Sequence, residues 1–306
     1  MGSPAFAVPA LEAVAGKHDV RLVVTQPDRP AGRGKRLAPP PVKEAAERAG
    51  IPVIQPRATK KPAFASELAA VGADVGVVVA YGRILPKRVL DVFPQGCLNI
   101  HASLLPSYRG AAPVPWAIIR GERETGVSIM RLDEGMDTGP VLATERVQID
   151  PHDTAGSLTQ RLAPLGANLL LDVLRAVEEG SARETPQDDA QATYAPPLDK
   201  RAGVVDWSRP ARAVCDLIRG VDPWPGATTT ASGEPLKLFA PSVASDEAGA
   251  APAEPGRILA VNDSIVVACG EGAARVGEVQ APGKRRIAAG DFARGRRLSP
   301  GVRLGT

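Results

Sequence analysis

The chain has 306 residues, of which 44% are hydrophobic and 23% charged, and its net charge is +3. This length is enough for about two domains, and the composition excludes a disordered chain, a coiled coil and a fibrous repeat. No apolar run reaches the ~20 residues that a membrane-spanning helix needs, and the first residues do not resemble a secretory leader. We therefore expect a protein of the cytoplasm that does not bind membranes.

Short apolar runs alternate with amphipathic stretches up to about residue 150. The pattern predicts strands at 20–24, 51–54, 74–80 and 98–101, and helices at 6–16, 42–50 and 61–72. The run at 74–80 is continuously apolar, which is typical of a strand buried on both faces. Alternation of strand and helix predicts right-handed βαβ units. The fold class is therefore α/β with a mainly parallel sheet.

The start of the chain lacks an element that such a domain should have. A strand is expected first, but the chain opens in a loop at residues 1–5 and passes directly into the helix predicted at 6–16. Either the first strand is absent or the natural start lies upstream.

A long helix is predicted after two alternating strands at 126–132 and 141–149. Asp153 or Thr154 can cap its first turn, and Gly180 is a suitable stop. Pro164 and Gly166 lie inside it, so we expect a kink or an interruption there.

The last third of the chain predicts a small β domain. Residues 181–205 are polar and contain three prolines, which indicates a linker, and residues 210–219 form a predicted helix. Five short strands follow, at 227–231, 235–240, 257–261, 264–269 and 274–280. Such closely spaced short strands are typical of a small barrel of the OB type.

Basic residues gather at both ends of the chain. Residues 1–60 and 257–306 each have a net charge of +5, so the stretch between them has −7. This distribution favours an anionic partner larger than a metabolite. The loop at 25–41 has no phosphate-binding glycine motif but contains four basic residues, Arg29, Arg33, Lys35 and Arg36. It is expected to contact a nucleic-acid backbone, the alternative being an ordinary basic surface loop.

The densest group of potentially reactive residues follows the strand at 98–101. Asn99 and His101 point to the same side of that strand, at the edge of the sheet where open α/β folds bind ligands. An amide and an imidazole there can stabilise an oxyanion and move a proton. Asp137, on a glycine-flanked turn, could orient the imidazole. The alternative is a buried, hydrogen-bonded histidine beside two ordinary turn residues.

The three cysteines, Cys97, Cys215 and Cys269, stand far apart and form no CxxC pair. They predict neither a disulfide framework nor a zinc site. Their apolar neighbours indicate small buried side chains, and no metal is expected in the protein.

Nine short segments, spread over nearly the whole chain, form a recognisable set. They are residues 25–35, 78–86, 99–106, 108–113, 124–127, 137–139, 205–207, 218–219 and 223–226. With NIHASLLP at 99–106 and YRGAAP at 108–113 as its most specific parts, this set resembles the methionyl-tRNA formyltransferase family.

The resemblance implies a Rossmann-like formyltransferase domain at 1–180, a linker at 181–205 and an OB-like tRNA-binding domain at 206–306. The implied reaction moves a formyl group from 10-formyltetrahydrofolate to the α-amino group of methionine on initiator tRNA. The implied catalytic trio is Asn99, His101 and Asp137.

The resemblance also assigns two binding segments. Folate binding falls on Ser103, Leu104, Leu105 and Pro106. The loop that engages the tRNA acceptor end carries Arg29, Arg33, Lys35 and Arg36. Members of the family usually have an apolar strand before the Gly-Ser-Pro loop, and Met1 stands where that strand should end; a misassigned start is the expected reason.

Three other functions compete with this interpretation. The first is formyl transfer to another amine, on a nucleotide sugar or a purine precursor. The second is hydrolysis of 10-formyltetrahydrofolate, and the third is tRNA binding without catalysis. The basic loop and the basic C-terminal segment favour a tRNA substrate, and the protein is expected to be a monomer.

Overall fold

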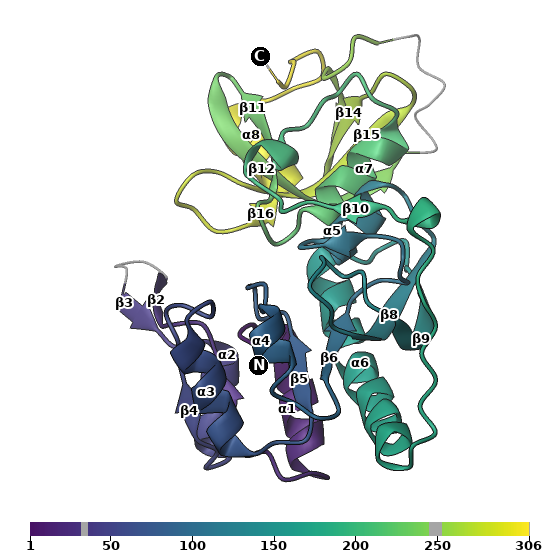
Figure 1. Cartoon of the computed structure of the whole chain (residues 1–306). Helices are drawn as coiled ribbons and strands as arrows, with labels where there is room; N and C mark the ends of the chain where they lie inside the picture. The colour runs from purple at the N-terminus through teal and green to yellow at the C-terminus, as the bar shows by residue number, and fades with distance from the viewer. Residues whose placement is uncertain (32–35, 245–252, 306) are drawn as a thin grey trace. The chain divides into compact units, whose positions relative to one another are not determined.

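The computed structural model describes residues 1–31, 36–244 and 253–305 (Figure 1). The chain divides into two compact units. Unit 1 comprises Met1–Pro113, Thr125–Gln148 and Thr159–Pro196, and unit 2 comprises Val114–Glu124, Ile149–Leu158 and Pro197–Thr306.

The central strand of unit 1 is β6 (Cys97–His101), and all five of its residues are buried. It pairs in parallel with β5 (Gly76–Val79) and antiparallel with β8 (Glu124–Arg131). With β9 (Val141–Gln148) beyond β8, the strand order is β5-β6-β8-β9. The strands expected at 74–80, 98–101, 126–132 and 141–149 are confirmed.

The helices expected in this region are also present. They are α1 (Val8–Ala15), preceded by the 3-10 turn η1 (Ala5–Ala7), α2 (Pro41–Arg48) and α3 (Pro62–Val71). Both α2 and α3 have proline in the first turn, where no backbone N–H is needed, and α3 ends at the left-handed Gly72. The short helix α4 (Lys87–Leu90) was not expected, because four residues are too few to show a helical period.

The strand predicted at 20–24 is shorter than expected. Only β1 (Val23–Val24) forms a ladder, in parallel with β4 (Val53–Ile54). Met1 and Gly2 lie between β1 and β5: the Gly2 N–H donates to the Val24 carbonyl at 3.0 Å, and the Val79 N–H donates to the Met1 carbonyl at 2.8 Å. In the described chain, these two residues therefore link the β1-β4 pair to the four-stranded sheet β5-β6-β8-β9.

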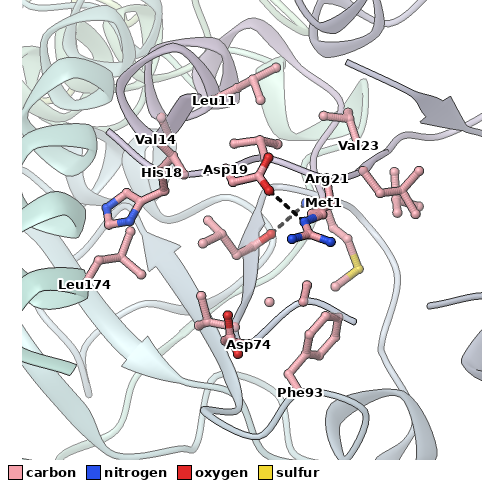
Figure 2. Close-up of a pocket in the computed structure, with 18 of the residues that line it drawn as sticks. Met1, Leu11, Val14, His18, Asp19, Arg21, Val23, Asp74, Phe93 and Leu174 are labelled. Atoms are coloured by element: carbon pink, nitrogen blue, oxygen red, sulfur yellow. Dashed lines mark hydrogen bonds and ion pairs between the residues drawn. The ribbon is translucent and has the colours of Figure 1, made fainter. Parts of the chain in front are cut away.

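A cavity of about 640 Å³ lies beyond Met1, between β1 and β5 (Figure 2). Apolar side chains of α1, of helix α6 (Ala155–Glu178), of the sheet and of the loop before β6 line much of it, among them Leu11, Val14, Phe93 and Leu174. Residues 20–22 also line this cavity and pair with no strand of the described chain. None of the predicted catalytic residues is among the described residues that line it.

Helix α6 (Ala155–Glu178) runs without interruption, so the break expected at Pro164 and Gly166 is wrong. Gly166 has another role: a Cβ at this position would lie 2.7 Å from Ile100 Cγ2, so glycine allows the helix to approach β6 closely. The expected cap is confirmed at Thr154, whose Oγ1 accepts from the Ser157 N–H while Ser157 Oγ accepts from the Thr154 N–H.

Unit 2 contains the small β domain predicted for the end of the chain. Five strands lie in the order β11-β12-β15-β14-β13: β11 (Ala227–Ala231), β12 (Glu234–Val243), β13 (Ile258–Val261), β14 (Ile265–Ala268) and β15 (Ala273–Gln280). The two-residue strand β16 (Ile287–Ala288) pairs with β15.

The described part of unit 2 also contains the α-helices α5, α7 and α8, of which only α7 (Ala211–Gly220) was predicted. Helices α5 (Pro113–Ile119) and α8 (Ala289–Arg296) were not expected from the sequence. The prolines of the first and the glycines of the second disfavour a helix prediction. In the part of the chain that the structure describes, no helix is both long and apolar enough to cross a membrane.

Burial lowers the pKa of the Met1 α-amino group from 8.0 to about 6, because the ammonium form loses its hydration. The nitrogen donates to the Val77 carbonyl at 2.6 Å, beside the cavity between β1 and β5. A neutral amine is therefore favoured in the folded protein.

For a chain that begins at Met1, we expect the free energy of unfolding to fall by up to about 3 kcal/mol between pH 8.0 and about 6. The folded-state pKa lies below the unfolded-state value. The stabilisation is therefore complete above the unfolded-state pKa and is lost as the pH falls through the folded-state value. Urea unfolding at several pH values measures the effect. Acetylating the amine, which keeps an N–H for Val77, should remove this part of the dependence; an unchanged dependence would contradict the assignment.

Candidate active site

Asn99 and His101 lie at the carboxyl end of β6, on the same face of the strand. Their side chains are buried, with 8% and 6% exposure. Because β5 and β6 run parallel, their carboxyl ends meet at one edge of the sheet. The sequence pattern correctly placed both residues there.

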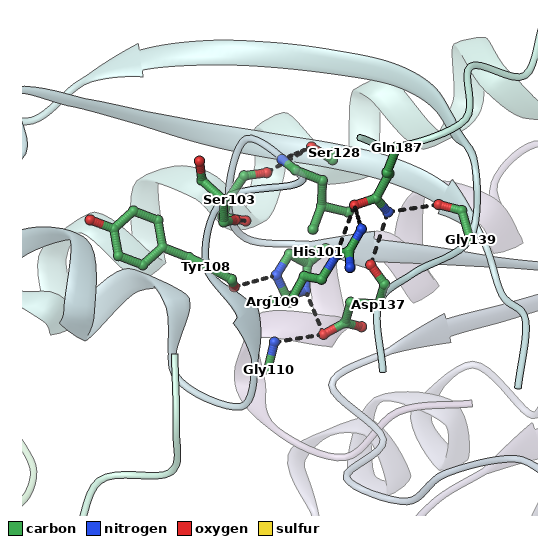
Figure 3. A network of polar contacts seen from close by, with 11 residues as sticks. His101, Ser103, Tyr108, Arg109, Gly110, Ser128, Asp137, Gly139 and Gln187 are labelled. Carbon is green, nitrogen blue, oxygen red and sulfur yellow. Dashed lines mark hydrogen bonds and ion pairs between the residues drawn. The ribbon is translucent and has the colours of Figure 1, made fainter. Parts of the chain in front are cut away.

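Two contacts fix the imidazole of His101 (Figure 3). Nε2 lies 2.9 Å from the Tyr108 carbonyl oxygen, and Nδ1 lies 3.7 Å from Asp137 Oδ2. A carbonyl can only accept, so Nε2 carries a proton and donates it. Nδ1 is therefore the nitrogen that can gain or lose a proton, and it faces a carboxylate.

Asp137 approaches His101 because its turn adopts an unusual backbone conformation. Its φ is 56°, in the left-handed region that aspartate tolerates better than most residues. Its Oδ2 also accepts a hydrogen bond from the Gly110 N–H at 2.8 Å. The predicted association of Asp137 with His101 is present in the structure, although 3.7 Å is longer than a direct hydrogen bond.

The Asn99 side chain makes no hydrogen bond to any described residue, although it is buried. Its amide atoms are not among the fully buried polar atoms that lack a partner, so the amide is accessible to a bound molecule. The arrangement therefore offers an N–H donor and a titratable nitrogen on one strand, with a carboxylate beside them. These are the groups that acyl transfer to an amine needs.

The segment Ser103–Pro106 is fastened to the sheet by Ser128 of β8. Ser128 Oγ donates to the Ser103 carbonyl at 2.7 Å and accepts from the Leu105 N–H at 3.1 Å. Ser103 Oγ donates to the Ser107 carbonyl at 2.6 Å, so this hydroxyl is used within the loop. Leu104 and Leu105 are only partly buried and leave apolar surface for a ligand. Ser128 was not among the predicted site residues.

The basic loop is only partly described. Arg33 and Lys35 lie outside the described residues, and Arg36 is described only as the first residue of strand β3. Strand β2 (Arg29–Ala31) pairs antiparallel with β3 (Arg36–Ala38), so the loop is a hairpin. Arg29 is exposed, and its Nη2 lies 3.3 Å from Gln26 Oε1.

One arginine of the basic stretch 257–306 has a structural role. Arg286 pairs with Asp222 at 2.6 Å, and its guanidinium lies 3.5 Å from the centre of the Phe239 ring. Its charge is therefore largely compensated within the unit.

The three cysteines are free and buried, as expected. Burial raises the pKa of Cys97 and Cys215 to about 12 and that of Cys269 to about 11. Thiolate nucleophiles do not form at neutral pH under these conditions.

This fold, with its polar group at the end of β6, defines a formyl transferase. A family model described as formyl transferase matches residues 4–174, and a second, described as formyl transferase, C-terminal domain, matches residues 197–297. A methionyl-tRNA formyltransferase from Sorangium cellulosum (strain So ce56) is 50% identical and aligns over 99% of this chain and 98% of its own length. One from Geobacter metallireducens is 47% identical over 100% of this chain and 97% of its own. The chain belongs to the methionyl-tRNA formyltransferase family.

Solved structures share the fold at much lower identity. WlaRD, a sugar 3N-formyl transferase crystallised in the presence of dTDP and 5-N-formyl-THF, is 16% identical with a TM-score of 0.68, covering 93% of this chain and 97% of its own. This likeness supports the Rossmann-like formyl transferase fold.

A substitution at Gly110 tests whether the loop that holds Asp137 requires glycine at this position. The φ of Gly110 is 116°, and a Cβ there would lie 2.8 Å from the Ala195 carbonyl oxygen. We expect Gly110→Ala to lower the free energy of unfolding by at least about 2 kcal/mol. Gly50→Ala is the matched control: its φ is 68°, with nothing within 4 Å of a new Cβ, so about 1 kcal/mol is expected. Equal losses in urea unfolding would show that the Ala195 carbonyl does not restrict position 110.

Proposed function

We propose that this protein transfers the formyl group of 10-formyltetrahydrofolate to the α-amino group of methionine on initiator tRNA. The observation that carries the proposal is the group formed by the buried Asn99 and His101 with the partly buried Asp137, in a chain that matches methionyl-tRNA formyltransferases over its whole length. Formyl transferases use this folate as the formyl donor.

The residues fit a reaction in which an amine attacks the formyl carbon. A C–N bond to methionine forms, the bond between the formyl carbon and the folate nitrogen breaks, and the folate nitrogen takes up a proton. Asn99 is positioned to donate a hydrogen bond to the oxyanion that develops on the formyl oxygen, and each such donor contributes about 3 kcal/mol.

His101 has the arrangement of a proton carrier. Its Nε2 proton is held by the Tyr108 carbonyl, which leaves Nδ1 to accept the proton that the attacking amine must lose. Asp137 faces Nδ1 and stabilises the resulting positive charge. In this proposal no covalent enzyme intermediate is needed.

The two halves of the chain have separate tasks in this proposal. The segment 1–180 carries the transfer chemistry, with the partly exposed Leu104 and Leu105 against the folate. The segment 206–306 and the basic hairpin hold the tRNA through its phosphates. A monomer in the cytoplasm, where charged tRNA is made, is sufficient for this activity.

The competing acceptors are less well supported. The sugar formyl transferase WlaRD is 16% identical to this chain, whereas the methionyl-tRNA formyltransferases reach 50%. A hydrolase would use the same polar group but has no need of basic residues at both ends. The near-complete coverage of full-length relatives also disfavours a non-catalytic tRNA-binding protein.

We expect His101→Ala to lower kcat for formyl-methionyl-tRNA formation by at least about 1000-fold, with tRNA affinity changed less than about twofold. The physical reason is loss of Nδ1, the ring nitrogen that we assign to receive the amine proton. His152→Ala, at an exposed position, is the matched control. Wild-type turnover by His101→Ala would contradict the assigned role.

We expect the double substitution Arg33→Ala and Lys35→Ala to raise the KM for tRNA by about tenfold and to flatten its salt dependence, because two phosphate contacts are lost. The KM for the folate should not change. Lys60→Ala with Lys61→Ala removes the same charge from exposed positions and serves as the control. A change in the folate KM alone would assign the loop to the other substrate.

A further inference from the structure

The segment 185–195, which the sequence pattern predicts to be part of a linker, is fastened to the candidate active site at both ends. Near its start, Thr185 and Val141 exchange two backbone hydrogen bonds, of 2.8 and 2.9 Å. At its end, β10 (Tyr194–Ala195) pairs in parallel with β7 (Arg109–Gly110). We call residues 185–195 the strap.

Gln187 of the strap joins the turn that carries Asp137 to Arg109 through its side-chain amide (Figure 3). Nε2 donates to the carbonyl oxygens of Asp137, at 2.9 Å, and Gly139, at 2.7 Å. Oε1 accepts from Arg109 Nε at 3.0 Å and Nη2 at 2.9 Å. Because carbonyls only accept and a guanidinium only donates, this orientation of the amide is the one that satisfies all four bonds.

Arg109 anchors the other side of Gln187. Its side chain is 2% exposed, and Nη2 also donates to Asp189 Oδ1 at 2.8 Å. Asp189 itself is exposed and belongs to the short turn η2 (Asp189–Gln191) of the strap. The buried guanidinium thus takes both its side-chain partners from the strap, and it holds Gln187 in a fixed position.

The strap also reaches the partner of His101. Thr193 Oγ1 accepts from the Tyr108 N–H at 2.8 Å, and the Thr193 carbonyl accepts from the Arg109 N–H at 2.8 Å. Tyr108 provides the carbonyl that fixes His101 Nε2. The two groups that orient the imidazole, the Tyr108 carbonyl and the Asp137 carboxylate, are therefore both tied to the strap.

We propose that Gln187 is a positioning residue for formyl transfer: its amide holds the backbone of the 137–139 turn so that the Asp137 carboxylate faces His101 Nδ1. Gln187 has no contact with His101 in this role and acts only through Asp137. The assignment rests on the proposed function for its kinetic consequence. The alternative is a strap that only stabilises the fold.

The decisive substitution is Gln187→Glu. Glutamate has the same size and still accepts from Arg109, so the buried guanidinium keeps its partner. Both N–H donors are lost, however, and a carboxylate oxygen then faces the carbonyls of Asp137 and Gly139. Gln191→Glu is the matched control, because it makes the same chemical change on the same strap at an exposed residue that bonds only to Asp188.

The kinetic test is a double-mutant cycle that combines Gln187→Glu with Asp137→Asn. We expect Gln187→Glu to lower kcat by at least about tenfold, with both KM values changed less than about threefold. In the Asp137→Asn background, the same substitution should change kcat by less than about twofold. Gln191→Glu should leave kcat unchanged. An equal loss of kcat in both backgrounds would overturn the proposal and show a purely structural role.

A second measurement does not depend on activity. The chain has three histidines, His18, His101 and His152, so their imidazole ¹⁵N signals are readily assigned with His101→Ala. Gln187→Glu should move the His101 ring signals and leave those of His18 and His152 in place. Unchanged His101 signals would overturn the proposal. Failure of the unsubstituted protein to formylate methionyl-tRNA would refute the proposed function. If Gln187→Glu still moved the His101 signals in that case, the positioning role would be retained.

Discussion

The hydrogen bond from His101 Nε2 to the Tyr108 carbonyl is the interaction on which the candidate site depends. It commits one ring nitrogen to a structural partner and leaves Nδ1 as the only position that can exchange a proton. Asp137 then matters because it faces that nitrogen. Without the first bond, the imidazole could rotate, and the carboxylate would have no defined partner.

Each group around the imidazole is held by main chain rather than by flexible side chains. The Gly110 N–H holds the Asp137 carboxylate, and the Tyr108 carbonyl holds the ring. Backbone partners cost no side-chain entropy when a substrate binds, so the polar group is preorganised. Gln187 extends this arrangement, since its amide bonds to backbone carbonyls of the turn rather than to the carboxylate itself.

Unit 1 combines the buried strand β6, which carries the candidate site, with a cavity elsewhere in the unit. The cavity beside Met1 lies along β1 and β5, whereas the candidate site is built on β6 and β8. β6 is buried along its whole length and is paired on both sides. The cavity therefore leaves the strand that carries Asn99 and His101 with both of its partners.

Local patterns in the sequence determined the fold class and most elements. Apolar periodicity predicted the strands and helices of unit 1, and Asn99 and His101 could be placed on one face because alternate residues of a strand share a face.

Where these rules failed, tertiary contacts had the larger effect. α6 continues through Pro164 with a face of buried leucines, Leu158, Leu162, Leu170 and Leu174, and β1 is limited to the two residues that pair with β4. The bonds from Arg109 to Gln187 join residues 78 positions apart, and the approach of Asp137 to His101 depends on a left-handed turn. Neither has a periodic signal, because only the folded path of the chain brings such groups together.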